Sequence, residues 1–175
     1  MAASLSLGAL SITALLSLYA AWIDSREMII PNWVSIAIVG AFAVRWYYAP
    51  ESVSFPADIL LGVGMFFTSA LLFQTRILGG GDLKLITALG LWFGTTHTVE
   101  FLIWTGIFGG LLSLVIVIVT YLDRLGILHP KMMFEALMPA MRREKSHSRA
   151  IAYGPAITAG ALVILPQQLI TMGYA

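Results

Sequence analysis

The stretch Gly79-Gly80-Gly81-Asp82-Leu83-Lys84 lies between two long apolar runs, where a carboxylate is costly. A second acid, Asp24, ends the first apolar run of the chain. Ionisable residues at membrane depth usually face a protein interior or a watery cavity and mark a working site. The two acids therefore predict a catalytic pair.

The composition predicts a membrane protein. Of the 175 residues, 59% are hydrophobic and 11% are charged, with a mean hydropathy of +0.88, which is too apolar for a soluble domain. We expect one transmembrane domain over residues 1–175. The net charge of +1 gives no indication of nucleic-acid binding. The absence of cysteine excludes disulfides, thiolate catalysis and cysteine-ligated metal sites, and we expect no metal or cofactor.

Six apolar segments approach the roughly 20 residues that a membrane-spanning helix needs, which predicts an all-α, polytopic fold with six transmembrane helices. They are residues 5–22, 33–48, 59–73, 83–93, 99–122 and 151–170. The fourth is short, because a helix over 82–94 would be about 20 Å long against a hydrocarbon core of about 30 Å. We therefore expect a non-helical loop at 79–82 that dips below the membrane surface, which protein or water must surround.

The basic residues predict the orientation. Six spans place nine of the ten Lys and Arg residues on one side, which the positive-inside rule makes cytoplasmic. Both termini are then exterior, and Asp24 and Asp82 share the cytoplasmic face. On that side, residues 131–141 combine apolar and basic positions before Arg142 and Arg143, a pattern suited to lying on anionic membrane lipid.

Each acid alone has an ordinary interpretation. Asp24 could be a solvated residue at a helix end, and the glycines a flexible connection with Asp82 as N-cap. Together, two carboxylates on one face can hold a water, one as base and the other as acid, and hydrolyse an amide without metal, Ser or Cys. Two alternatives are a small transporter or channel that uses both acids as a proton or cation relay, and a structural subunit without chemistry.

Three motifs resemble those of the type IV prepilin peptidases, membrane aspartyl proteases of the GxGD type. The first runs from Asp24 to Pro31-Asn32, where the family has an Asp followed by Pro and Asn or Asp. The second is Gly79-Gly80-Gly81-Asp82-Leu83-Lys84, continuing to Gly94, and the third is Tyr153-Gly154-Pro155. The motifs occur in the family's order, and the resemblance covers most of the chain.

The resemblance implies that Asp24 and Asp82 are the catalytic aspartates. The other motif residues would form the active-site loop and its surroundings: Gly79, Gly80, Gly81, Lys84, Pro31, Asn32, Tyr153, Gly154 and Pro155. The implied partner is a prepilin-like peptide with a short basic leader, cut at the cytoplasmic face of the cell (inner) membrane just before its apolar helix. Such cleavage serves type IV pilus assembly and protein secretion.

The resemblance is to the compact Tad/Flp-pilus or archaeal-like branch, because the cysteine-bearing N-terminal domain of larger members is absent from this sequence. Larger members also N-methylate the product, but no separate methyl-donor site is recognisable here, so peptidase activity alone is expected. Helix dipoles suggest how the pair shares a proton. The end of the first helix disfavours charge on Asp24 and the start of the fourth favours charge on Asp82, which predicts that Asp24 is protonated.

Overall fold

The computed structural model describes residues 2–50, 53–74, 79–125 and 152–171, whose regular secondary structure is entirely helical. The helices are α1 (Ala2–Glu27), α2 (Asn32–Tyr48), α3 (Ala57–Gln74), α4 (Gly80–Arg124) and α6 (Gly154–Thr171). Within the described residues, three stretches are long and apolar enough to cross a membrane: Leu7–Glu27, Ala57–Gln74 and Gly80–Leu122. The predicted all-α membrane protein is thereby confirmed. The surface helix predicted at 131–141 lies outside the described residues.

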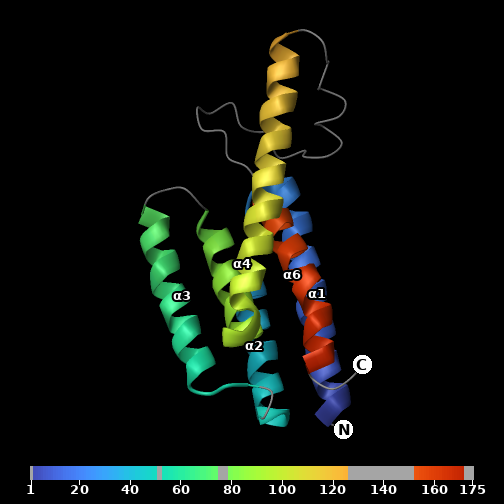
Figure 1. Cartoon of the computed structure of the whole chain (residues 1–175), viewed down its shortest axis with the longest axis vertical. Helices are drawn as coiled ribbons and strands as arrows, with labels where there is room; N and C mark the ends of the chain where they lie inside the picture. The colour runs from blue at the N-terminus through green and yellow to red at the C-terminus, as the bar shows by residue number, and fades with distance from the viewer. Residues whose placement is uncertain (1, 51–52, 75–78, 126–151, 172–175) are drawn as a thin grey trace.

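Helix α4 is divided by a sharp bend at Gly94, whose φ of 62° and ψ of −168° are not helical. We call residues 80–93 the first arm and residues 95–124 the second arm. The two arms run in opposite directions in Figure 1. Glycine is required at the bend because these dihedral angles are essentially closed to residues with a Cβ atom. The bend separates the segments 83–93 and 99–122 that the sequence predicts as two spans.

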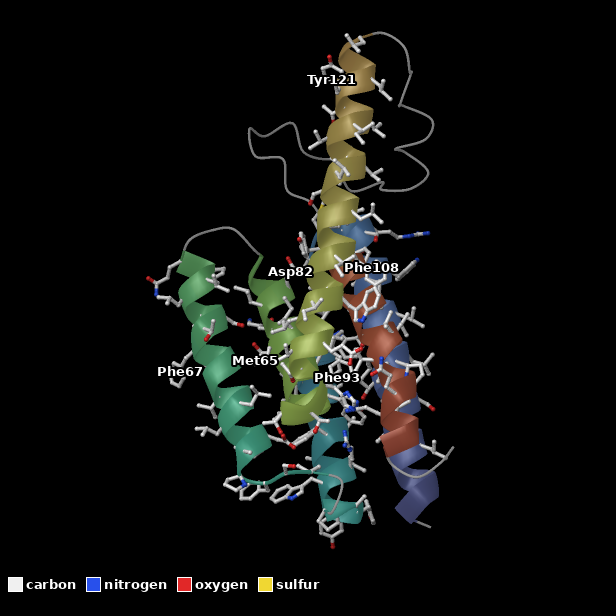
Figure 2. All side chains as sticks on the ribbon, viewed as in Figure 1. Met65, Phe67, Asp82, Phe93, Phe108 and Tyr121 are labelled. Atoms are coloured by element: carbon white, nitrogen blue, oxygen red, sulfur yellow. The ribbon has the colours of Figure 1, made fainter. Side chains whose placement is uncertain are left out.

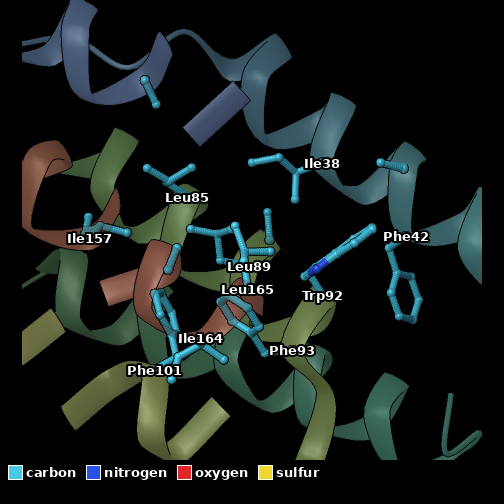
Figure 3. Packing of buried hydrophobic residues seen from close by; sticks show 14 of the residues in the cluster. Ile38, Phe42, Leu85, Leu89, Trp92, Phe93, Phe101, Ile157, Ile164 and Leu165 are labelled. Carbon is cyan, nitrogen blue, oxygen red and sulfur yellow. The ribbon is translucent and has the colours of Figure 1, made fainter. Parts of the chain in front are cut away.

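The first arm of α4 is the centre of the bundle. Its side chains Leu85, Leu89 and Trp92 are almost fully buried, and α2 and α6 pack against them through Ile38 and Ile157 (Figure 3). Helix α1 packs against α2 and α6, whereas α3 packs against α4 at the edge of the bundle. The core therefore holds in place the helix that begins beside Asp82.

The second arm of α4 extends beyond the ends of the other described helices (Figure 1). Phe108 lies at about the height of Asp82, whereas Tyr121 lies near the far end of the molecule (Figure 2). Residues 110–122 contain no charged side chain, and large side chains such as Leu114 and Val117 are more than half exposed. The described ends of α1 and α6 that lie nearest the chain termini are together at the opposite end of the bundle. Asp82 therefore lies level with the middle part of this apolar second arm, well below its far end.

Candidate active site

Asp24 lies in the last turn of α1, with only 5% of its surface exposed. The helix continues to Glu27 and ends where Met28 adopts a left-handed φ of 56°. The Met28 N–H donates to the Asp24 carbonyl oxygen at 2.9 Å. Such a bond often closes the last turn of a helix when the residue after the helix is left-handed. The Asp24 carboxyl oxygen Oδ2 accepts a hydrogen bond of 2.7 Å from the N–H of Gly154. Asp24 is thus joined to the start of α6.

The third motif explains this contact. Gly154 is the first residue of α6, and a Cβ atom there would lie 2.8 Å from Asp24 Oδ2, so only glycine lets the carboxyl approach. Tyr153 precedes the helix, and its ring lies directly against Gly109 in the second arm of α4. Pro155 follows as the second helical residue, where a missing N–H breaks no helical bond. The motif joins α1, α4 and α6.

Asp82 is the third residue of α4 and is 8% exposed. The predicted loop at 79–82 is wrong, because α4 begins at Gly80. The Leu83 N–H donates to the Gly79 carbonyl oxygen at 3.2 Å, and Asp82 Oδ2 accepts the Gly79 N–H at 3.3 Å. In these two bonds, Gly79 occupies the N-cap position and the side chain of the third helical residue accepts its N–H, as in a capping box. They hold the chain in a helix although three successive glycines can adopt many non-helical conformations. Asp82 is therefore not the N-cap itself.

The first and second motifs touch each other. A Cβ atom on Gly81 would lie 2.9 Å from Ile30 Cβ, so the missing side chain lets the start of α4 approach the segment before α2. Pro31 is the N-cap of α2, and Lys84 Nζ donates to Asn32 Oδ1 at 2.9 Å. Lys84 therefore joins the start of α4 to the start of α2 through the Asn32 amide. Sequence spacing could not reveal the role of Ile30, which lies inside the first motif.

The structure brings Asp24 and Asp82 close enough for their carboxyl groups to interact electrostatically. Asp82 Oδ1 is buried and has no hydrogen-bond partner among the described residues. Two interacting carboxyl groups titrate as a unit and can share one proton. Such a pair can act as base and acid on one water molecule.

A cavity of about 270 Å³ lies beside this site, between α3 and the first arm of α4. Phe66 and Phe73 line it from α3, and Gly80, Lys84 and Thr87 line it from α4. These three residues of α4 are spaced as one face of a helix, and Asp82 lies on a different face. The cavity is therefore a neighbour of the aspartates rather than their immediate surroundings.

A second set of polar contacts lies at the bend of α4, which is below Asp82 in Figure 2. Asp58, 6% exposed, accepts hydrogen bonds from the N–H of Ser54 at 2.8 Å, from the N–H of Thr95 at 2.7 Å and from the Thr95 hydroxyl at 2.9 Å. The buried Arg45 donates to the Trp92 carbonyl oxygen at 3.0 Å, and its charge interacts with that of Asp58.

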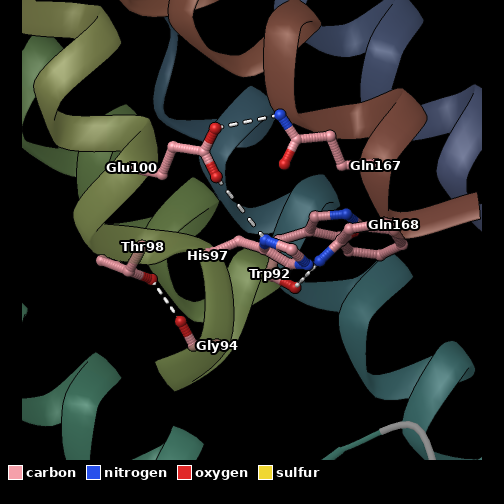
Figure 4. A network of polar contacts seen from close by, with 7 residues as sticks. All are labelled: Trp92, Gly94, His97, Thr98, Glu100, Gln167 and Gln168. Carbon is pink, nitrogen blue, oxygen red and sulfur yellow. Dashed lines mark hydrogen bonds and ion pairs between the residues drawn. The ribbon is translucent and has the colours of Figure 1, made fainter. Parts of the chain in front are cut away.

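The same end of the bundle is tied to α6 (Figure 4). Gln167 donates to Glu100 at 2.9 Å, and Gln168 donates to the Trp92 carbonyl oxygen at 3.4 Å. The Thr98 hydroxyl donates to the Gly94 carbonyl oxygen at 2.6 Å. These contacts fix the bend, and with it the direction of the first arm that leads to Asp82.

Comparison with curated proteins and with solved structures gave no match. A family model does match, over residues 11–114, which are 104 of the 175 residues and include Asp24 and Asp82. The model describes the type IV leader peptidase family, which implies an aspartic-type peptidase activity. The resemblance seen in the sequence motifs is confirmed, and the chain belongs to the type IV leader peptidase family.

Proposed function

We propose that this protein is an endopeptidase that removes the short basic leader from prepilin-like substrates, with Asp24 and Asp82 as its catalytic pair. One observation carries the assignment of the residues. Two buried carboxyl groups from α1 and α4 interact, and Asp82 Oδ1 has no hydrogen-bond partner among the described residues. A buried polar atom without a partner is costly to keep, so its presence beside a second acid supports a chemical role.

The proposed reaction needs only the pair and a water molecule. The water oxygen bonds to the peptide carbonyl carbon, one carboxylate takes the water proton, and the other, protonated, gives its proton to the carbonyl oxygen. The C–N bond then breaks. The newly protonated acid gives its proton to the leaving nitrogen, while the newly ionised one removes a proton from a hydroxyl of the intermediate. Both acids return to their starting states, and a chelator should leave the rate unchanged.

The glycine that precedes α4 supports a peptide substrate. Gly79 is exposed, and a Cβ atom there would lie 3.0 Å from Asp82 Oδ2, so the missing side chain leaves space beside this carboxyl group. A peptide must be extended to be cut, and backbone without Cβ atoms leaves room for an extended chain to approach. The family relation supports the basic leader and the apolar helix of the substrate.

We further propose six membrane crossings, with both termini exterior and the aspartates toward the cytoplasmic face of the cell membrane. The reversal of α4 at Gly94 supports counting its arms as two crossings. The exposed Arg26 and Lys84 lie near the aspartates, as the positive-inside rule expects. The chain has no native cysteine, so single cysteines can report each side. Glu27→Cys should react with an impermeant thiol reagent only from the cytoplasm, and Thr96→Cys only from outside.

The function is tested by incubating the purified protein in lipid nanodiscs with synthetic peptides made of a leader joined to an apolar helix. Mass spectrometry should find one cut, directly before the apolar helix, in the peptide with a Lys/Arg leader. The matched peptide with a Glu leader should be cut much more slowly. Equal cleavage of both peptides would remove the basic leader from the proposal, and no cleavage of either would remove the peptidase assignment for these substrates.

A further inference from the structure

We propose that the two aspartates have fixed and different roles. Asp24 is the ionised partner that takes the water proton, held by the Gly154 N–H, and Asp82 carries the proton that its Oδ1 delivers to the substrate carbonyl oxygen. This inference rests on the proposed function, because it assumes that both acids act on one peptide bond. It also gives the third motif a role, since Gly154 becomes a positioning residue for Asp24.

The hydrogen bonding of Asp24 suits a charged group. Its Oδ2 lies 2.7 Å from the Gly154 nitrogen, which is the length expected when an N–H donates to an ionised carboxylate. This N–H belongs to the first residue of α6, where helical N–H groups have no partner within the helix. The start of α6 therefore offsets the effect of the α1 end on Asp24.

The hydrogen bonding of Asp82 suits a neutral acid. Its one described hydrogen bond, from the Gly79 N–H, is long at 3.3 Å, and its Oδ1 is buried without a partner among the described residues. An ionised carboxylate at this place would leave much of its charge without hydrogen bonds, which is costly away from water. A protonated carboxyl instead offers an O–H to the substrate.

Typical magnitudes decide between these effects. A helix dipole stabilises a nearby charge weakly, and the dipoles of α1 and α4 alone would place the charge on Asp82. A short hydrogen bond to a charged group stabilises that charge more strongly than a helix dipole does. The short bond from Gly154 therefore outweighs the dipoles, and the assignment is the reverse of that predicted from helix ends in the sequence.

Gly154 fits this role in two ways. A Cβ atom there would lie 2.8 Å from Asp24 Oδ2, so any other residue displaces the carboxyl. The contact of the preceding Tyr153 with Gly109 holds the start of α6 against α4. The amide that faces Asp24 is thus fixed by packing on the helix that also carries Asp82.

The first experiment compares the two acids separately. Infrared spectroscopy in nanodiscs follows the protonated-carboxyl band against pH in Asp24→Asn and in Asp82→Asn, each referred to the double variant. Each single variant leaves one acid without the charge of the other. Asp82 in Asp24→Asn should keep its proton to higher pH than Asp24 in Asp82→Asn. The opposite order, or equal order, overturns the assignment of roles.

The second experiment isolates the Gly154 N–H. In the Asp82→Asn background, both Gly154→Ala and Gly154→Pro add the Cβ atom that crowds the Asp24 carboxyl, but only Gly154→Pro also replaces the N–H with a ring carbon. Proline is tolerated at the first position of a helix. Asp24 should keep its proton to a pH about 1–2 units higher in the Pro variant than in the Ala variant. Equal titration in both would show that the N–H does not hold the charge.

Neither experiment depends on cleavage, so the inference can fail while the proposed function stands. If the wild-type protein cuts no prepilin-like peptide, the proposed function fails whatever the spectra show. Circular dichroism of each variant checks that it is folded. If Gly154→Pro does not fold, the order found in the two single variants still decides the assignment.

Discussion

Two sites in this molecule bury aspartates to a similar extent but differ in the hydrogen bonds and charges around them. Asp58, at the bend of α4, is 6% exposed, and Asp24 and Asp82 are 5% and 8% exposed. Asp58 accepts three hydrogen bonds and interacts with the charge of the buried Arg45. Asp24 and Asp82 each accept one hydrogen bond from the described residues, and their two carboxyl groups interact with each other. Burial alone therefore does not distinguish a structural acid from one that we propose to be catalytic.

The difference lies in how completely each carboxylate is satisfied. Three hydrogen bonds and a nearby cation satisfy the Asp58 carboxyl group, so its polar atoms hold the bend together. An acid with few donors beside a second acid can gain or lose a proton at low cost, which acid–base catalysis needs. Proteins often depart from full hydrogen bonding at functional sites and compensate elsewhere. Here the well-bonded bend holds the helix that presents Asp82.

The largest expected effect tests the reactive side of the comparison. Asp24→Asn and Asp82→Asn should each reduce peptide cleavage by about a thousandfold or more, because an amide can neither accept nor return the water proton. The losses should not add in the double variant, since the pair acts as a unit. The melting temperature should stay within a few degrees of the wild type, which is measured alongside the cleavage assay. Retained activity in either folded single variant would remove that residue from the mechanism.

The second prediction tests the structural side. Asp58→Ala should lower the free energy of unfolding by about 3–5 kcal/mol, because it leaves the Arg45 charge buried and removes the cap from Thr95. Thermal denaturation in detergent measures the change. Asp82→Asn is the matched control, a buried aspartate whose loss should cost little stability. Equal destabilisation by the two substitutions would break the distinction between the sites.

The third prediction concerns the bend that Asp58 caps. Gly94→Ala should destabilise the protein by about 1–3 kcal/mol, because alanine is strained at a φ of 62°. Its Cβ atom would also lie 2.7 Å from the Asp58 carboxyl. Gly110→Ala, in the same helix, adds a Cβ atom where nothing lies within 4 Å and should leave stability unchanged or raise it. A smaller loss for Gly94→Ala than for Gly110→Ala would contradict the account of the bend.

The smallest expected effect is at the end of α1. Met28 has a left-handed φ of 56°, which costs a non-glycine residue about 1–2 kcal/mol. Met28→Gly should therefore raise the free energy of unfolding by about 0.5–1 kcal/mol, part of the relief being lost to the greater freedom of the unfolded chain. Ile29→Gly, at an exposed neighbour without a positive φ, should instead lower stability slightly. A change in cleavage rate with Met28→Gly would link this strained residue to the position of Asp24.

The sequence predicted those parts of the molecule that depend on local pattern. Apolar runs predicted the helices. The position of Asp24 at the end of one run and of Asp82 between two runs predicted that these acids form a pair. Spacing along the chain could not predict contacts such as Lys84 with Asn32 or Gly154 with Asp24, because these join distant segments. Three glycines predicted a loop, but hydrogen bonds from the Gly79 N–H to Asp82 and from the Leu83 N–H to Gly79 form a helix start instead. The burial of Asp58 and Arg45 was not predicted, because a charged residue near a helix end has the same sequence pattern whether it is buried or in a solvated loop.

The overhanging second arm of α4 has a consequence for the lipid around the protein. From Thr95 to Leu122 this arm has a length of about 42 Å, whereas the 18 residues of α3 or of α6 measure about 27 Å. One flat bilayer cannot match both lengths, so the arm must tilt or the bilayer must be thinner around α3 and α6. A thinned bilayer would bring headgroups and water closer to the aspartates, and the charged leader that we propose for the substrate would then travel a shorter distance out of water. Acyl-chain length should therefore influence this peptidase more than it influences a membrane protein whose helices are equally long.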